Sequence, residues 1–182
     1  MPMIRRLLPT ESDLLLAHLQ RLTADDRRLR FQGQVSDRVI GERVRTINWF
    51  RTHVLVALES GAVIGAAEIA FDRAWRPTEA ELAITVDAQH QGAGIGTELT
   101  RRAVQFARVF DAQRVVMVCL TENAKMRRIA QGLTAELAFE QGEVVSSLTL
   151  QPATVATWWS SVLAGWVGLV SGAVERWRPS PS

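Results

Sequence analysis

Hydrophobic residues in the first 150 positions recur with the two periods that distinguish strands from helices. Apolar residues at three- and four-residue spacing predict one helix that begins near Glu11, a second over residues 36–49 and a third that follows Gly94. Short apolar runs rich in β-branched residues predict the strands, at residues 4–8, 53–58, 63–70, 81–87, 115–120, 137–140 and 144–150. The order of these helices and strands predicts an α/β fold, in which a central mixed β-sheet is flanked by helices.

A glycine-rich segment, Gln91-Gly92-Ala93-Gly94-Ile95-Gly96, joins the strand at 81–87 to the helix behind it. Glycine has no Cβ, so main-chain N–H groups in such a segment can closely approach a ligand. The first turn of the helix offers further unpaired N–H groups and the positive end of a dipole. The segment therefore predicts a phosphate-binding loop; the alternative is a tight turn that serves only helix–strand packing.

The spacing of the glycines separates several phosphate-binding classes. A Walker loop requires a lysine and a Ser or Thr after its last glycine, and a dinucleotide fingerprint requires Gly-x-Gly-x-x-Gly. Here the spacing is Gly92-x-Gly94-x-Gly96, and no lysine follows. The pattern Gln-x-x-Gly-x-Gly after a strand resembles the pyrophosphate loop of the GNAT superfamily of N-acetyltransferases, which hold acetyl-coenzyme A.

The resemblance continues beyond the loop and covers roughly residues 4–150. Asn123 follows the strand at 115–120 and resembles the second cofactor element of the family, in which an Asn opens a helix and its side chain meets the pantetheine arm. The alternative role for Asn123 is a plain helix N-cap. Residues 7–31 resemble the N-terminal half of bacterial protein lysine acetyltransferase domains.

The resemblance implies a GNAT-like acyl-coenzyme A N-acyltransferase fold and a set of cofactor contacts. Three strand residues would pair with the pantetheine as an added strand, the loop would hold the diphosphate, and the helix after Asn123 would contact the arm. No metal is expected. The cofactor-binding residues implied in this way are Ile84, Thr85, Val86, Gln91, Gly92, Ala93, Gly94, Ile95, Gly96, Thr97, Asn123 and Met126.

An amine acceptor must lose a proton before it attacks a thioester, because lysine has a pKa of about 10.4. A carboxylate near the acyl group can accept that proton directly or through one water. Glu81 occupies the position at which the family carries such a glutamate, and it is the expected catalytic residue; its alternative role is a solvent-facing strand residue. Glu68 and Glu79 are rival bases. Main-chain amides near Val86 would stabilise the developing oxyanion.

One departure from the family concerns the general acid. Many relatives carry a tyrosine in the helix after the Asn, but this chain has no tyrosine, and Ala130 stands at that place. Water could return the proton to the thiolate, Cys119 and His90 are conceivable donors, or the step needs no acid. The absence also leaves open a non-catalytic, acyl-coenzyme A-binding regulatory module.

Residues 152–182 form a second unit after the domain at 1–151. No charge occurs between Glu143 and Glu175, and four tryptophans gather in the segment, Trp158, Trp159, Trp166 and Trp177. Bulky apolar residues fall on one side of a helix and small or polar residues on the other, which predicts an extra C-terminal amphipathic helix. It would dock on its own domain or form a homodimer; contact with a membrane surface is the alternative.

Composition restricts the partners and the compartment. The formal net charge is only +2, so nothing requires nucleic acid as a partner. Cys119 is the single cysteine, which excludes an internal disulfide and suits a reducing compartment. No apolar stretch follows the charges of residues 1–6, so the cytoplasm is the expected location. The favoured acceptor is a protein lysine; a small cationic amine is the alternative, bound in an acidic cleft of Asp72, Glu79 and Glu81.

Overall fold

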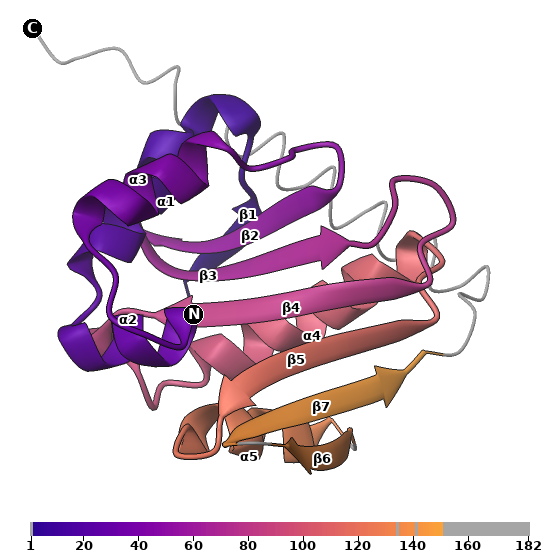
Figure 1. Cartoon of the computed structure of the whole chain (residues 1–182). Coiled ribbons are helices and arrows are strands. Elements are labelled where there is room, and N and C mark those ends of the chain that lie inside the picture. The colour runs from indigo at the N-terminus through magenta and orange to yellow at the C-terminus, as the bar shows by residue number, and fades with distance from the viewer. Residues whose placement is uncertain (1, 134, 141, 151–182) are drawn as a thin grey trace, which may run out of the picture.

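Seven strands form a single mixed sheet in the order β1-β2-β3-β4-β5-β7-β6 (Figure 1). The structure is a computed structural model that describes residues 2–133, 135–140 and 142–150. Neighbouring strands are antiparallel, except that β4 and β5 are parallel. The strands are β1 Met3–Arg6, β2 Thr52–Glu59, β3 Ala62–Phe71, β4 Glu79–Val86, β5 Arg114–Leu120, β6 Glu136–Glu140 and β7 Glu143–Thr149.

Helices cover both faces of this sheet. In Figure 1, α4 lies behind the sheet, and α1 and α3 lie over β2 and β3 on the opposite face. Alternate residues of β2 divide between two hydrophobic cores: Val54 and Val56 face α1 and α3, whereas Leu55 and Ala57 face α4. The helical segments are η1 Pro9–Glu11, α1 Ser12–Arg21, α2 Ala24–Phe31, α3 Asp37–Arg45, η2 Ala88–His90, α4 Ile95–Val109 and α5 Ala124–Gly132.

The predicted α/β architecture is confirmed, with differences at the element ends and in one helix. The helical region predicted at 36–49 ends at Arg45, after which residues 46–51 turn into β2. The helix α2 is not among the helices that periodicity predicts. Its residues 24–31 carry four charges in a row, Asp25 to Arg28, and none of its side chains is fully buried. A helix without an apolar stripe gives no periodic signal.

The functionally important feature of the sheet is a gap between β4 and β5. These parallel strands pair only where Glu79–Glu81 meet Arg114–Val116. Beyond that point β4 stays paired with β3 up to Val86, while β5 stays paired with β7. The second half of β4, residues 82–86, therefore has an open edge on the side toward β5.

The predicted C-terminal amphipathic helix at 152–182, with its expected homodimer or membrane contact, lies outside the described residues. Within the part of the chain that the structure describes, no helix is both long and apolar enough to cross a bilayer.

Candidate active site

A groove of about 690 Å³ opens at the gap between β4 and β5. Its volume falls in the range of about 300–1,000 Å³ that is usual for small-molecule sites. One wall comes from α2 and another from β5 and α5, while β4 residues 81–86 and the loop after η2 form the floor and one end. Segments far apart in the sequence thus meet around the open edge of β4.

The glycine-rich loop presents main-chain donors at one end of the groove. Gly92 and Gly94 both have φ of +80°, a conformation that L side chains rarely adopt. Gly94 is the N-cap of α4, and the N–H groups of Ile95, Gly96 and Thr97 have no acceptor among the described residues. These free donors, at the positive end of a 15-residue helix, suit an anionic group such as a diphosphate.

Gly96 explains how α4 begins so close to the sheet. A Cβ built on Gly96 would lie 3.3 Å from Ile129 Cδ1 and 3.6 Å from Val86 Cγ2. At Gly96 the loop therefore does serve helix–strand packing, which was its alternative role. Space within 4 Å of a Cβ on Gly92 or Gly94 is open, so those two glycines serve the backbone conformation rather than packing.

The Gln91 side chain ties the loop to three other elements. Its Nε2 donates to the Val86 carbonyl at 3.0 Å and to Asp26 Oδ1 at 3.1 Å, and Lys125 Nζ donates to its Oε1. Because these bonds occupy both ends of the amide, Gln91 holds the loop against β4, α2 and α5. Sequence reasoning singled out Gln91 but not Asp26 or Lys125, whose approach is visible only in three dimensions.

Alternation along β4 determines which main-chain groups face the gap. The Asp87 N–H donates to the main-chain carbonyl of Ile64 in β3, so the odd-numbered residues of β4 bond to β3 and the even-numbered ones face the other way. Ile84 and Val86 therefore direct their N–H groups into the groove. Thr85 instead pairs with β3 through its backbone and contacts His18 Nε2 through its Oγ1, at 2.8 Å.

Asn123 is the N-cap of α5, as its alternative role predicted. Its Oδ1 accepts a hydrogen bond from Met126 N at 3.0 Å. Asn123 and Met126 both line the groove, so the cap and a cofactor contact are compatible. The side-chain Nδ2 of Asn123 has no hydrogen-bond partner within the described residues and is available as a donor.

Of the three acidic candidates, Glu81 is the one that lines the groove. Its side chain is exposed, lines the groove and makes no ion pair with any described residue. It lies at the last paired position of β4 and β5, opposite Val116, just where the gap begins.

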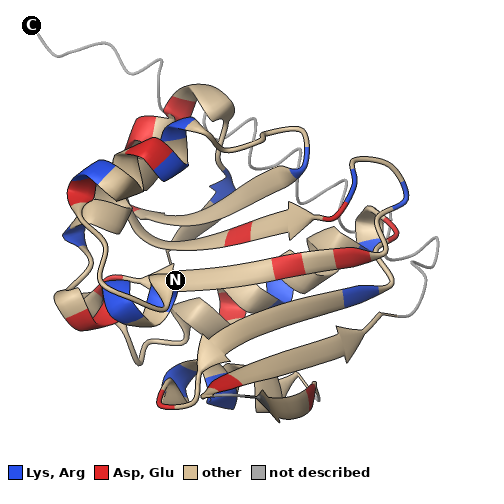
Figure 2. Cartoon of the chain, viewed as in Figure 1, with Lys and Arg blue, Asp and Glu red and all other residues tan. Residues whose placement is uncertain are grey.

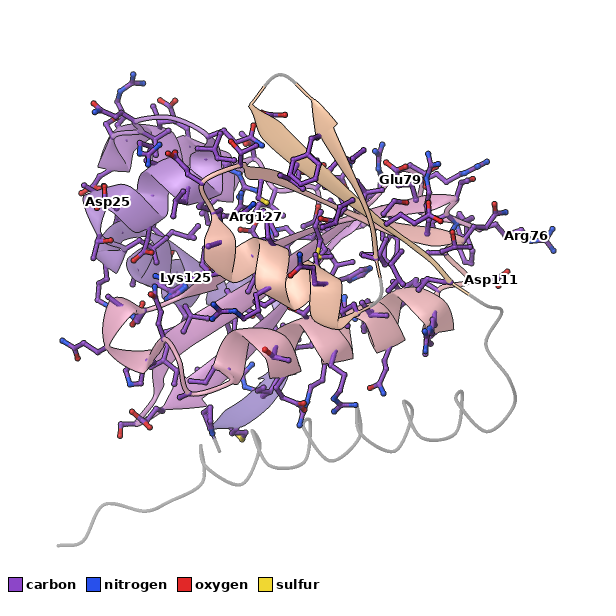
Figure 3. All side chains as sticks on the ribbon, turned by 90° about the horizontal axis from the view of Figure 1, so that it is seen from below. Asp25, Arg76, Glu79, Asp111, Lys125 and Arg127 are labelled. Atoms are coloured by element: carbon purple, nitrogen blue, oxygen red, sulfur yellow. The ribbon has the colours of Figure 1, made fainter. Side chains whose placement is uncertain are left out.

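The other two candidate bases, Glu68 and Glu79, are bound by arginines. Glu68 is 5% exposed, and its two carboxylate oxygens bond to Arg30 and Arg43 at 2.7 Å each. Burial opposes ionisation of Glu68, but the two guanidinium groups outweigh it and lower its pKa. Glu79 bonds to Arg114 at 2.6 Å and does not line the groove. Figure 3 shows Glu79 at the end of the molecule opposite to Lys125.

An acidic cleft made of Asp72, Glu79 and Glu81 does not form, which corrects that expectation. The Asp72 Oδ1 accepts from the main-chain N–H of Thr78 at 3.0 Å and of Glu79 at 3.3 Å, and so closes the loop before β4. Of the three carboxylates, only Glu81 lines the groove. The basic residues Arg30 and Arg43 line it instead, and sequence reasoning did not identify them as site residues.

No tyrosine is available as a general acid, and Ala130 is fully buried in α5. Cys119 lines the groove, and its burial raises the pKa of the thiol, so that it stays protonated at neutral pH. His90 also lines the groove, but its Nε2 lies 3.1 Å from Glu59 Oε2.

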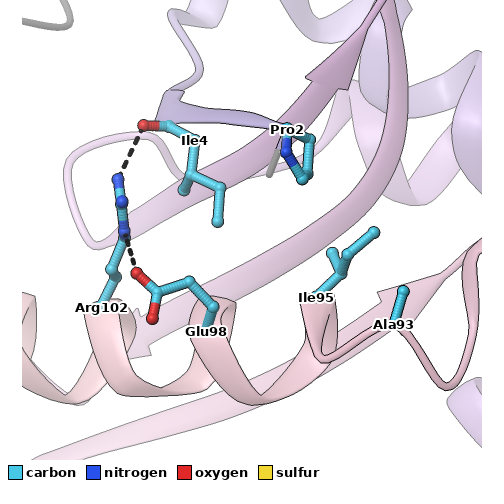
Figure 4. Close-up of a pocket in the computed structure, with 6 residues that line it drawn as sticks. All are labelled: Pro2, Ile4, Ala93, Ile95, Glu98 and Arg102. Atoms are coloured by element: carbon cyan, nitrogen blue, oxygen red, sulfur yellow. Dashed lines mark hydrogen bonds and ion pairs between the residues drawn. The ribbon is translucent and has the colours of Figure 1, made fainter.

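A second cavity, next to Pro2 and Ile4, is not a ligand site, because its volume is only about 30 Å³ (Figure 4). Arg102 closes it by donating to the Ile4 carbonyl at 3.0 Å and to Glu98 Oε1 at 2.7 Å. This contact fastens β1 to α4. Within the described residues, no group of three or more His, Cys, Asp or Glu side chains could hold a metal ion.

The fold and the site together define an acyl-coenzyme A-dependent N-acyltransferase. The profile described as "Acetyltransferase (GNAT) domain" matches residues 4–135. The chain therefore belongs to the GNAT acetyltransferase family, whose co-substrate is acetyl-coenzyme A. No curated protein sequence matches the chain closely enough to count as a relative.

Solved structures share this fold at low sequence identity. The GNAT domain of S. lividans PAT is 21% identical, covers 81% of this chain and 89% of its own, and superposes with a TM-score of 0.70. A Salmonella typhimurium protein described as an acetyltransferase, solved with acetyl-coenzyme A, is 19% identical over 85% of this chain and 97% of its own, with a TM-score of 0.60. A cAMP-binding acyltransferase from Mycobacterium smegmatis is 26% identical, with a TM-score of 0.58; the match covers 95% of this chain but 51% of that one.

Proposed function

We propose that this protein transfers an acetyl group from acetyl-coenzyme A to a primary amine, with Glu81 as the general base. Transfer occurs by direct attack within a ternary complex of enzyme, acetyl-coenzyme A and acceptor. The favoured acceptor is a lysine side chain of a protein. The observation that carries the proposal is the Glu81 carboxylate at the point where β4 and β5 separate, since it has no ion-pair partner in the described part of the chain.

The cofactor contacts follow from the donors around the groove. The N–H groups of residues 92–97 hold the diphosphate, and Ile84 and Val86 bond to the pantetheine along the open edge of β4. Asn123 and Met126 contact the arm from the α5 side, while Thr85 and Gln91 hold β4 and the loop in place. Acetyl-coenzyme A supplies an acetyl group that is activated as a thioester.

Glu81 removes a proton from the ammonium form of the acceptor, directly or through one water. The amine nitrogen then bonds to the acetyl carbon as the carbon–sulfur bond breaks, and a main-chain N–H of β4 near Val86 stabilises the negative charge on the carbonyl oxygen. After the attack the nitrogen loses its second proton, which reaches the sulfur through water because the chain has no tyrosine, and Glu81 releases the first proton to solvent.

A likeness to protein acetyltransferases supports a protein lysine as the acceptor. The PAT of S. lividans is a protein acetyltransferase, and the N-terminal half of this chain resembles that branch. A small-molecule amine is a second candidate acceptor. A non-catalytic module that binds acyl-coenzyme A is a second candidate function, favoured by the buried Ala130 where many relatives carry a tyrosine.

Thiol release from acetyl-coenzyme A separates these possibilities. An enzyme releases thiol faster when a peptide lysine or a small amine is added, and the acceptor that gives the larger rate identifies the branch. Tight binding of acetyl-coenzyme A without thiol release across a broad panel of amines would favour the regulatory module.

The location and the assembly state belong to the same proposal. The protein acts in the cytoplasm, and residues 152–182 form a homodimer contact or, as the alternative, touch a membrane surface. Both statements rest on the sequence pattern.

A further inference from the structure

Two arginines from different helices converge on one buried carboxylate beside Glu81. Arg30 of α2 and Arg43 of α3 each bond to one oxygen of Glu68. The side chain of Glu68 is 6% exposed, that of Arg30 12% and that of Arg43 38%. Two guanidinium charges against one carboxylate leave one positive charge in excess.

The cluster lies on the same side of the sheet as Glu81. Glu68 is opposite Ala83, and Glu81 is two residues earlier on β4, so the two glutamates are diagonal neighbours on one face. Diagonal neighbours of this kind are typically about 7–8 Å apart. Arg30, Arg43 and Glu81 all line the groove, and Figure 2 shows the acidic positions of β3 and β4 close together on the sheet.

The arginines have hydrogen-bond donors to spare. A guanidinium carries five N–H donors, yet only Nη1 of Arg43 has an acceptor among the described residues. The buried Nε of Arg30 also lacks a partner there. The ring of Phe31 lies 5.1 Å from Arg30 Cζ and 5.8 Å from Arg43 Cζ, and this packing restricts both side chains.

Neutralising the buried Glu68 carboxylate does not by itself require two arginines. One arginine would neutralise Glu68, and the second leaves a positive charge next to the catalytic carboxylate. During catalysis Glu81 accepts a proton and loses its negative charge, which makes the local excess larger. A carboxylate on the acceptor would balance that charge, and an arginine can bind it through two parallel hydrogen bonds.

We propose that Arg43, supported by Arg30, binds a carboxylate of the acceptor, so that the enzyme selects amines with a carboxylate close to the reactive nitrogen. This inference rests on the proposed function and specifies its substrate class. Two sources have this chemistry: an acidic residue beside the acceptor lysine of a protein, and a free amino acid. Arg43 is a specificity residue in either case, and Glu81 remains the base.

The test compares matched acceptors with the full-length protein. One arm uses blocked peptides in which a single lysine is flanked by aspartates or by asparagines, and the other uses alanine and alaninamide. We expect kcat/KM for thiol release to be at least tenfold higher for the carboxylate-bearing member of one pair, and that pair identifies the source. Equal kcat/KM within both pairs would overturn the inference while leaving acetyl transfer intact.

Variants assign the preference to Arg43. Arg43→Gln leaves Glu68 paired with Arg30, and it should lower about tenfold the ratio of kcat/KM for the carboxylate-bearing acceptor to kcat/KM for its neutral match. Arg45→Gln removes an exposed charge from the same helix and is the matched control, with wild-type selectivity expected. Arg43→Lys should restore part of the preference, because it keeps the charge but not the bidentate geometry. A preference that survives Arg43→Gln would contradict the assignment.

A binding measurement distinguishes this failure from failure of the proposed function. The same acceptor pairs are titrated by calorimetry into protein saturated with coenzyme A. If acetyl-coenzyme A releases no thiol with any of the acceptors, the proposed enzyme activity is excluded. Equal affinity for the charged and neutral members of each pair would instead exclude the carboxylate site. Tighter binding of the charged member, lost in Arg43→Gln, supports the site even without turnover.

Discussion

The Nε2 of Gln91 donates a hydrogen bond to the main-chain carbonyl of Val86 at 3.0 Å, and this bond joins the glycine-rich loop to the end of β4. One end of the groove carries the free donors of the loop, and the other carries Glu81, five residues before Val86 on the same strand. A ligand held by both the loop and the open edge of β4 is thereby aligned with Glu81.

We expect Gln91→Ala to raise the Kd for acetyl-coenzyme A about tenfold. The substitution removes the hydrogen bonds to Val86, Asp26 and Lys125, each worth about 0.5–1.5 kcal/mol. Part of this lost free energy weakens binding, because the loop is less ordered without these bonds. Calorimetric titration measures the change. The control is Gln89→Ala, an exposed position of η2, which should bind as the wild type does. Equal affinity in all three proteins would show that the side chain does not organise the loop.

Replacement of Glu81 by Gln should lower kcat about 10²- to 10⁴-fold, the usual contribution of a general base. The affinity for coenzyme A should stay nearly unchanged, because Glu81 lies away from the loop that holds the diphosphate. Steady-state thiol release and calorimetry report the two quantities separately. Glu79→Gln is the matched control, since it removes a carboxylate two residues away that bonds to Arg114 outside the groove, and it should keep most of the activity. Equal turnover in the Glu81→Gln and wild-type proteins would exclude Glu81 as the base.

Two glycine-to-alanine substitutions should change stability in opposite directions. A Cβ on Gly65 of β3 would lie 3.1 Å from Leu99 Cδ1 and 3.2 Å from the main-chain oxygen of Thr85, so Gly65→Ala should destabilise the fold by about 1–3 kcal/mol. A Cβ on Gly41, inside α3, would have nothing within 4 Å. Gly41→Ala should therefore stabilise by about 0.5–1 kcal/mol through helix propensity. Urea unfolding measures both, and a stabilised Gly65→Ala protein would contradict the close packing of α4 on β3.

His53 of β2, which is buried against Arg6 of β1 and Phe106 of α4, makes stability depend on pH. Burial, aided by the charge of Arg6, lowers the pKa of His53 to about 4, from an ordinary value of 6.5. Its Nδ1 must accept from Arg6 Nη2, 2.7 Å away, because arginine only donates. The unfolded chain therefore binds the proton more readily, and the contribution of His53 is complete above pH 6.5 and lost as the pH falls to about 4.

His53→Gln keeps an acceptor for Arg6 but does not titrate. Its thermal midpoint should vary less between pH 6.5 and 4 than that of the wild type, measured by circular dichroism at the same ionic strength. Some dependence should remain, because burial also lowers the pKa of His18. Parallel pH curves for the two proteins would show that His53 is not held neutral by the fold.

Local sequence signals predicted the glycine-rich loop at one end of the groove better than the contacts of Arg30 and Arg43 with Glu68. The strand, glycine loop and helix from Glu81 to Phe110 are contiguous, so spacing and residue type define their geometry. The contact of Arg30 and Arg43 with Glu68 joins three segments, and α2 lacks an apolar stripe that would reveal it. The acidic cleft was predicted wrongly for a related reason: Asp72 and Glu79 have local partners that their positions in the sequence do not disclose.

Calorimetric titration of the full-length protein with acetyl-coenzyme A tests the central claim most directly. If main-chain donors of residues 92–97 hold the diphosphate, the titration should show saturable 1:1 binding well below millimolar concentration. An absence of any heat of association at millimolar acetyl-coenzyme A would contradict the site and, with it, the proposed acetyl transfer.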